Sequence, residues 1–300
     1  MNREPDHVPA RLWGLLAALS LAWGFNWTAM KLALSELPPW TFRAICLGAG
    51  SVVLFAALRV SGQPFLWPRG QWRRLWLLAV LNISAWNILI AFGVKMIASG
   101  RAAILAYTMP ALAIPLSAWL LGERLAPGKI AGLALGMAGM ALLIGEGFAG
   151  IGASPLGSLL VLGAAASWAL GAVLQKKYPV ALPAGPYTAW IMLLGALPIV
   201  AGAALFEDQA WMRHVGPGAV LGTLYNVLIA FAFAHWAWIK LATSMSVSAF
   251  SLSMLVIPMV GVFSGAVFLG ERPTVLEYLA LLLVVGSLAS VLSPGRAARE

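Results

Sequence analysis

Long apolar runs, each ended by a short cluster of charged or turn-forming residues, dominate this chain. A helix crosses the hydrocarbon core of a bilayer in about 20 residues. Charges and Pro/Gly clusters divide the sequence into ten segments of about that length, with short loops that leave no room for a soluble domain. The expected spans are residues 12–33, 40–60, 74–94, 99–121, 127–146, 156–175, 184–205, 217–239, 246–268 and 274–293.

The composition agrees with an all-α polytopic membrane protein. The chain is 61% hydrophobic and 10% charged, whereas soluble domains carry about 25% charged residues, and its mean hydropathy is +0.90. The apolar run from Leu12 to Met30 is too long for the core of a cleavable signal peptide. A single cysteine, Cys46, excludes an internal disulfide.

The distribution of Lys and Arg predicts the orientation. The N-terminus, the C-terminus and alternate loops hold thirteen of these residues, including "RGQWRR" at 69–74, and the remaining loops hold six. Cytoplasmic loops carry the excess of positive charge. Both termini are therefore expected in the cytoplasm, and the net charge of +9 is interpreted as membrane anchoring rather than nucleic-acid binding.

One short phrase occurs twice, as "LLGER" at 120–124 and "FLGER" at 268–272. Around it, residues 109–124 align with 257–272, which places Pro110 over Pro258. Earlier in the halves the offset is 145 positions, which places Trp23 over Trp168 and Lys31 over Lys176. The predicted halves, 1–148 and 149–300, hold five spans each. Because five is odd, the second half is inverted, as in many secondary transporters.

The repeated phrase also predicts a turn. Gly122 and Gly270 are suited to end a helix, and Pro127 and Pro273 to open the next one. The glutamates Glu123 and Glu271 are expected to accept hydrogen bonds from the free N–H groups of that next helix.

Ten spans in two five-helix repeats, a "GE" at the end of each fourth helix, and "AWGFNW" at 22–27 resemble the drug/metabolite transporter superfamily. More narrowly, the chain resembles its bacterial EamA-type exporters, among them the inner-membrane exporter of aromatic amino acids. The resemblance implies a multi-pass inner-membrane protein in which helices 1–4 and 6–9 surround a central cavity and helices 5 and 10 form a scaffold. Independently, helix 5 has glycines at about every fourth position, which suits close helix packing: Gly128, Gly132, Gly136 and Gly139.

Polar and aromatic side chains deep within the spans are the candidate substrate contacts. Each also has a structural alternative, since Trp and Tyr form interfacial belts, Asn bonds neighbouring helices and Ser bonds its own backbone. The candidates are Trp23, Asn26, Asn82, Trp86, Asn87, Tyr107, Trp168, Tyr225, Asn226 and Ser251.

None of the ten acidic residues lies near the centre of a span, which argues against proton antiport through a membrane carboxylate. His235 is the remaining candidate for proton coupling, with a neutral, structurally bonded histidine as the alternative. The sequence shows no HExxH, clustered carboxylates or Cys–His pair, so we expect no enzyme activity, metal or cofactor. A channel or a membrane scaffold is a further alternative.

Aromatic faces with neutral amides suit a substrate whose charges are balanced, such as a neutral or aromatic amino acid. Lipophilic cationic drugs are the alternative, and phosphorylated sugars fit worse because phosphate favours Lys or Arg. Arg43 is expected to snorkel to the interface. Pro110 and Pro258 are expected to interrupt helices 4 and 9 and are candidate hinges. A monomer is plausible because one chain supplies both halves.

The inversion predicts that the two copies of the phrase face opposite sides of the membrane. In intact cells, Arg272→Cys should react with an impermeant thiol reagent and Arg124→Cys should not, because only Arg272 is expected outside. Labelling of both positions, or of Arg124→Cys alone, would contradict the predicted topology.

Overall fold

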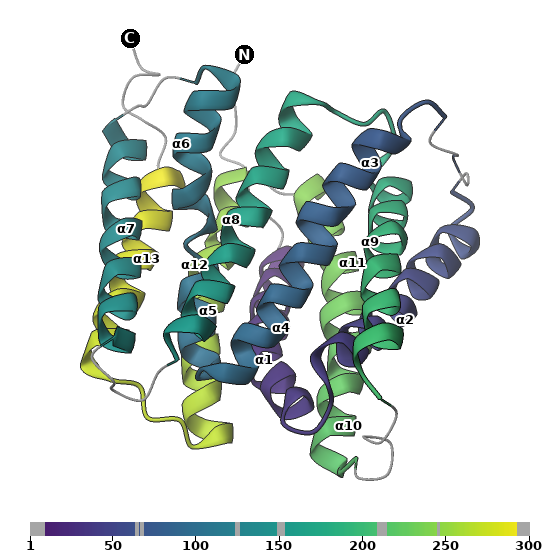
Figure 1. The fold of residues 1–300 in the computed structure, drawn as a ribbon. Coiled ribbons are helices and arrows are strands. Elements are labelled where there is room, and N and C mark those ends of the chain that lie inside the picture. Colours follow the sequence, from purple (N-terminus) through teal and green to yellow (C-terminus); the bar gives the residue numbers. More distant parts are fainter. Residues whose placement is uncertain are drawn as a thin grey trace.

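The computed structural model describes residues 10–63, 66, 69–123, 127–148, 154–208, 215–244 and 247–292, which form ten helical rods lying side by side (Figure 1). The first five are α1 (Ala10–Leu34), α2 (Pro39–Val60), the continuous α3–η1–α4 (Trp72–Ala79, Val80–Ala85, Trp86–Met96), the broken pair α5 and α6 (Ser99–Ala106, Met109–Leu121), and α7 (Pro127–Phe148). The second five are α8 (Pro155–Lys177), α9 (Ala184–Phe206), the continuous α10–η3–α11 (Pro217–Leu224, Tyr225–Phe233, Ala234–Ser244), α12 (Val247–Leu269) and α13 (Val275–Leu292).

The predicted architecture is confirmed. Within the described residues, six helices are long and apolar enough to cross a membrane, and three further apolar stretches are shorter. The ten rods follow the ten expected segments closely and form two five-helix repeats of inverted topology. Because the number of rods is even, α1 begins and α13 ends at the same end of the bundle, which we call the near end. The far end carries the turn between α4 and α5.

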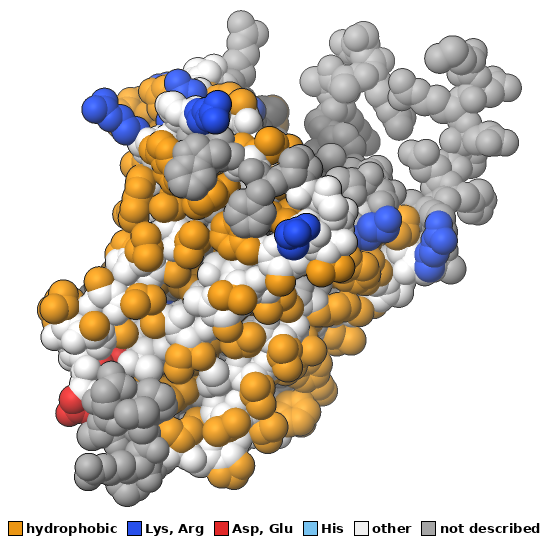
Figure 2. Space-filling view, turned by 90° about the vertical axis from the view of Figure 1, so that its right-hand side faces the viewer, with side chains coloured by type: hydrophobic (Ala, Val, Ile, Leu, Met, Phe, Trp, Pro, Cys, Tyr) orange, Lys and Arg blue, Asp and Glu red, His pale blue; other side chains and the backbone are white. Residues whose placement is uncertain are grey.

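Charge follows the two ends of the bundle. Figure 2 shows Lys and Arg side chains gathered toward the near end, acidic side chains lower on the molecule, and hydrophobic side chains over the middle. This distribution fits a chain that is solvated by lipid around its middle and by water at both ends.

Helices α7 and α13 pack together at one edge of the bundle (Figure 1). A Cβ added at Gly139 would lie 3.3 Å from the carbonyl oxygen of Ala280, and one at Gly128 would lie 3.0 Å from that of Ser290. The Ser287 hydroxyl donates to the Gly132 carbonyl at 2.6 Å. The glycines of helix 5 therefore allow the backbones to approach, as the sequence predicted.

Gly122 and Gly270 end their helices as expected, but the glutamate predicted to cap α13 bonds another helix. Gly122 and Gly270 adopt left-handed φ angles of 67° and 65°. Helix α13 is capped instead by Thr274 and Glu277, whose side chains accept from each other's backbone N–H at 3.1 and 3.0 Å. Glu271 accepts hydrogen bonds from the start of α5. The sequence analysis correctly predicted that Glu271 accepts hydrogen bonds from the N-terminus of a helix. It missed that this helix is α5 of the other repeat.

The two aligned prolines have different effects on their helices. The fourth span is interrupted at Tyr107 and Thr108, and α6 then starts at Met109 with Pro110 in its first turn. Helix α12 continues through Pro258. The expected interruption of helix 9 is therefore wrong, and a hinge role for either proline stays a prediction.

Candidate functional site

Two π-helical segments lie in the middle of the bundle, at equivalent places in the two repeats. η1 begins at Val80 and η3 at Tyr225, 145 positions later, which is the offset that aligns Trp23 with Trp168. A π-helical turn is wider than an α-helical one and is frequent at functional sites. Its recurrence at the repeat offset means that both halves build the same local distortion.

Carbonyl groups of these segments accept hydrogen bonds from the other repeat. The Ser167 hydroxyl in α8 donates to the Leu81 carbonyl of η1 at 2.8 Å. The Trp23 indole in α1 donates to the Ala230 carbonyl of η3 at 3.2 Å. Because an unsatisfied carbonyl is expensive in a membrane, these bonds from the opposite repeat help to stabilise the distorted segments.

Aromatic rings meet beside both segments. Trp86, the residue after η1, contacts Trp168 of α8 with ring centroids 5.0 Å apart. In the second half, Phe231 occupies the position equivalent to Trp86, and Trp23 that equivalent to Trp168. Here a third ring, His235, stacks on Phe231 at 5.5 Å and meets Trp23 edge-on at 5.9 Å. The structure thus brings together four of the predicted residues in two pairs, Trp86 with Trp168 and Trp23 with His235.

The sequence reasoning missed Phe231 and also Trp238, whose ring lies 5.1 Å from that of Trp23. Aligning the halves at the offset of 145 positions would have found Phe231 opposite Trp86. Trp23, Trp86, Trp168, Phe231 and His235 are all half-buried, and the rings of Trp23, Trp86 and Phe231 pack against the main buried cluster.

The predicted asparagines are placed differently from one another. Asn87 and Asn226 are buried, and each donates at 2.9 Å to the carbonyl four residues earlier in its own span. Asn26 is half-buried. Among the described residues, three amide oxygens are buried without a hydrogen-bond partner: those of Asn26, Asn82 and Asn226.

The amide of Asn82 occupies the space beside Gly171 of α8, where an added Cβ would lie 1.5 Å from its oxygen. The positions equivalent to this pair are Val227 and Asn26. Each of these two equivalent pairs of positions therefore contains one asparagine. It lies on η1 in the first pair (Asn82) and on α1 in the second (Asn26).

The other predicted residues surround this region. Tyr225 donates from its hydroxyl to the Ala22 carbonyl at 3.0 Å and so joins η3 to α1. Tyr107 is buried where α5 ends. The side chain of Ser251 lies outside the described residues. A substrate-binding role for any of these residues stays a prediction.

Arg43 does not snorkel, contrary to the sequence-based expectation. Its side chain is 3% exposed, and the guanidinium lies 2.6 Å from the sulfur of Met30 and 5.1 Å from the Phe42 ring centroid. Arg43 starts only one turn into α2, so the packed far ends of α1 and α2 cover it before it reaches water.

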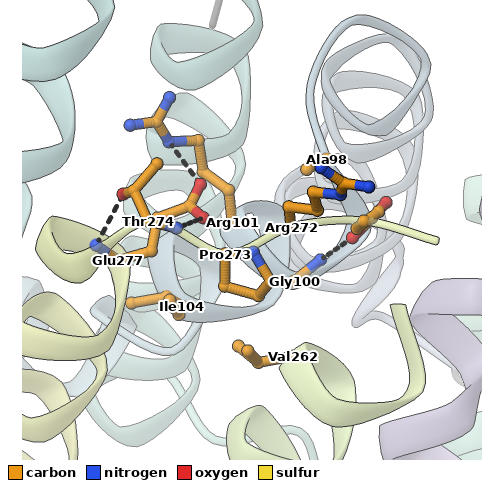
Figure 3. Close-up of a pocket in the computed structure, with 10 residues that line it drawn as sticks. Ala98, Gly100, Arg101, Ile104, Val262, Arg272, Pro273, Thr274 and Glu277 are labelled. Carbon is orange, nitrogen blue, oxygen red and sulfur yellow. Dashed lines mark hydrogen bonds and ion pairs between the residues drawn. The ribbon is translucent and has the colours of Figure 1, made fainter. Parts of the chain in front are cut away.

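The far end also contains a cavity of about 170 Å³ between α5 and the start of α13 (Figure 3). The Arg101 Nε lies 3.4 Å from the Glu277 carboxylate across it, and an Nη of Arg101 donates to the Leu143 carbonyl at 3.3 Å. These bonds hold α5 against α13 and α7. Among the residues that the structure describes, no group of three or more His, Cys, Asp or Glu side chains is arranged to hold a metal ion; the expected absence of a metal stays a prediction.

A protein-family model described as the EamA-like transporter family matches residues 9–145 and again residues 155–293. The chain belongs to the EamA-like transporter family. The two matches lie within the predicted halves, each covering one five-helix unit. Membership explains the inverted repeats and makes this a membrane transporter for small molecules.

Relatives along nearly the whole chain agree with this. An "Uncharacterized transporter YoaV" of Bacillus subtilis is 26% identical over 273 residues, 90% of this chain and 92% of its own. A "Probable amino-acid metabolite efflux pump" of Escherichia coli is 27% identical over 285 residues, 92% and 93% of the two chains. An "Uncharacterized inner membrane transporter YedA" of E. coli is 26% identical over 275 residues, 91% and 88%. A solved crystal structure with 24% identity and a TM-score of 0.66 covers 97% of this EamA chain and 99% of its own, which shows the shared fold.

The contact of Asn82 with Gly171 gives a stability prediction. Gly171→Ala should lower the free energy of unfolding by about 1–3 kcal/mol, because the new methyl group overlaps the Asn82 amide. Asn82→Ala in the same chain should restore most of that loss, since it removes the clash. Thermal unfolding of the detergent-solubilised EamA protein and its single and double variants would measure this coupling, and strictly additive losses would contradict the contact.

Proposed function

We propose that this EamA protein exports neutral and aromatic amino acids and related compounds by alternating access. The observation that carries the proposal is the pair of aromatic groups, Trp86 with Trp168 and Trp23 with His235, at the two π-helical segments. Their faces suit an aromatic or apolar side chain and attract an ammonium group.

Neutral polar groups near these rings support a zwitterionic substrate. The Asn26 amide oxygen, which lacks a hydrogen-bond partner among the described residues, is an acceptor for an ammonium group. All ten acidic residues of the sequence lie in loops or near span ends, so no fixed carboxylate selects for a cation alone. The E. coli relative named as a probable amino-acid metabolite efflux pump is consistent with this class of substrate.

We place the protein in the bacterial inner membrane with the near end, and hence both termini, in the cytoplasm. The excess of Lys and Arg at the near end supports this orientation. Substrate would enter from the near end and leave at the far end. One chain contains both repeats, so a monomer suffices, with membrane lipid around it and no nucleic-acid partner or cofactor.

Counterflow in proteoliposomes against a panel of amino acids and lipophilic cations tests the substrate class. Trp168→Ala and Trp86→Ala should each raise the half-saturation concentration for aromatic amino acids roughly 5- to 30-fold, as expected for losing about 1–2 kcal/mol of ring contact. Trp119→Ala is the control, because the Trp119 side chain is 79% exposed and belongs to neither ring pair. Counterflow only with lipophilic cations would replace the amino-acid proposal with the drug-export alternative.

His235 is the third ring of the second aromatic group and has no counterpart in the first. We therefore assign the proton-linked role to His235. Its Nδ1 lies 3.1 Å from the Ala230 carbonyl, and imidazole changes charge between pH 5 and 8. His235→Gln should abolish the dependence of export on a pH gradient, because glutamine keeps a donor and cannot titrate. Counterflow without a gradient is the control and should persist, with a raised half-saturation concentration because the variant also loses the imidazole ring beside Trp23. An unchanged pH dependence would show that His235 is structural.

A further inference from the structure

We infer that Glu271 and Lys31 form a latch that closes the far end, and that Glu123 and Lys176 are its counterpart at the near end. The inference rests on the proposed alternating access, and it assigns a gating role to four charged residues outside the aromatic site. It is carried by the contacts of these residues and by their equivalence under the repeat.

Glu271 holds the start of α5 from the other repeat. Its carboxylate accepts from the Ser99 N–H at 2.6 Å, the Gly100 N–H at 3.1 Å and the Ser99 hydroxyl at 3.0 Å. The left-handed Gly270 turns the chain back, so that the Glu271 N–H donates to the Gly265 carbonyl at 3.2 Å. A carboxylate at a helix N-terminus is favoured by the free N–H groups and the helix dipole.

Lys31 holds the end of α4 on the other side of the same turn. Its ammonium donates to the carbonyls of Val94 and Ile97 at 2.7 Å and of Lys95 at 3.2 Å. A cation is favoured at a helix C-terminus for the opposite electrostatic reason. The turn between α4 and α5 is therefore held by a cation from α1 and an anion from the end of α12.

The helices beneath the latch are packed without room for larger side chains. A Cβ added at Gly265 would lie 2.3 Å from the Glu271 carboxylate, and one at Gly100 would lie 3.0 Å from the Val262 Cα. The Thr28 hydroxyl donates to that of Ser264 at 2.7 Å and joins α1 to α12. Lys31, Lys95 and Glu271 also line a cavity of about 430 Å³ at the far end.

The equivalent pair at the near end is more exposed. Lys176, equivalent to Lys31, pairs with Glu123, equivalent to Glu271. The side chains are 69% and 24% exposed, so water screens their attraction. The positions equivalent to Thr28 and Ser264 are Val173 and Leu116, which cannot form that hydrogen bond. In this conformation the far end is therefore held more firmly than the near end.

A labelling experiment tests the latch without requiring knowledge of the substrate. Val262→Cys in a Cys46→Ala background places the probe under the latch, because Val262 is 4% exposed and packs on Gly100. The rate of reaction with an impermeant thiol reagent is measured in sealed vesicles from the far side. Glu271→Gln should raise this rate at least about tenfold, because it weakens charge-assisted bonds present only when the far end is closed.

Two further variants separate latch release from general loosening. Lys95→Gln, at the same mouth, should leave the rate at that of the background protein. Glu271→Gln combined with Glu123→Gln should lower the rate from that of the single variant by roughly two- to fivefold, because the exposed near-end pair contributes less to its closure than Glu271 does at the far end. A misfolded Glu271→Gln protein would not be rescued in this way.

The inference is overturned if Glu271→Gln labels no faster than background, if Lys95→Gln accelerates labelling equally, or if the double variant stays as fast as the single one. These outcomes are distinct from a failure of the substrate proposal. Labelling that responds as expected while no amino acid undergoes counterflow supports the latch and rejects the substrate class. Amino-acid counterflow with an unresponsive probe supports the substrate class and rejects the latch.

Discussion

The structure depends on one constraint, which is that backbone N–H and C=O groups inside a bilayer must find partners within the protein. Regular helices meet it along most of each span. Where a helix widens or ends, several of the partners come from the opposite repeat: Ser167 for Leu81, Trp23 for Ala230, and Glu271 for Ser99. The unusual backbone of this transporter is thus located where its two halves are joined by directed bonds.

The same constraint explains why the few charges of the chain lie where they do. Glu207, at the end of α9, accepts from the Trp40 and Thr41 N–H groups at the start of α2, at 3.0 and 2.7 Å. Glu36 accepts from the Gly216 N–H, and Gln71 accepts from the Ala181 N–H. Gly216 follows Gln71 by 145 positions, and Ala181 follows Glu36 by the same number. The two bonds therefore join equivalent pairs of turns. In both, the side chain comes from the first half and the N–H group from the second half.

The sequence predicted those features that local composition determines. Apolar length determines the spans, the spacing of glycines in helix 5 determines its packing on α13, and Gly122 and Gly270 determine two turns. The π-helical segments could not be predicted, because a shift of one hydrogen-bond register leaves hydrophobic periodicity almost unchanged. The partner of Glu271 was also missed, because it lies on a helix of the other repeat. The burial of Arg43 was missed because it depends on the packing of the neighbouring span, α1.

In the alternating access that we propose, departures from the internal symmetry set the difference in free energy between the two conformations. Perfectly equivalent halves would make the states closed at either end alike, since inversion exchanges one for the other. Here Thr28 and Ser264 bond at the far end, whereas their counterparts Val173 and Leu116 are apolar. In the proposed cycle, this extra bond would favour closure of the far end when no substrate is bound. Under the proposed export from the near side, that preference would keep the aromatic rings facing the supply of substrate, and binding would have to provide the free energy that releases Glu271 from α5.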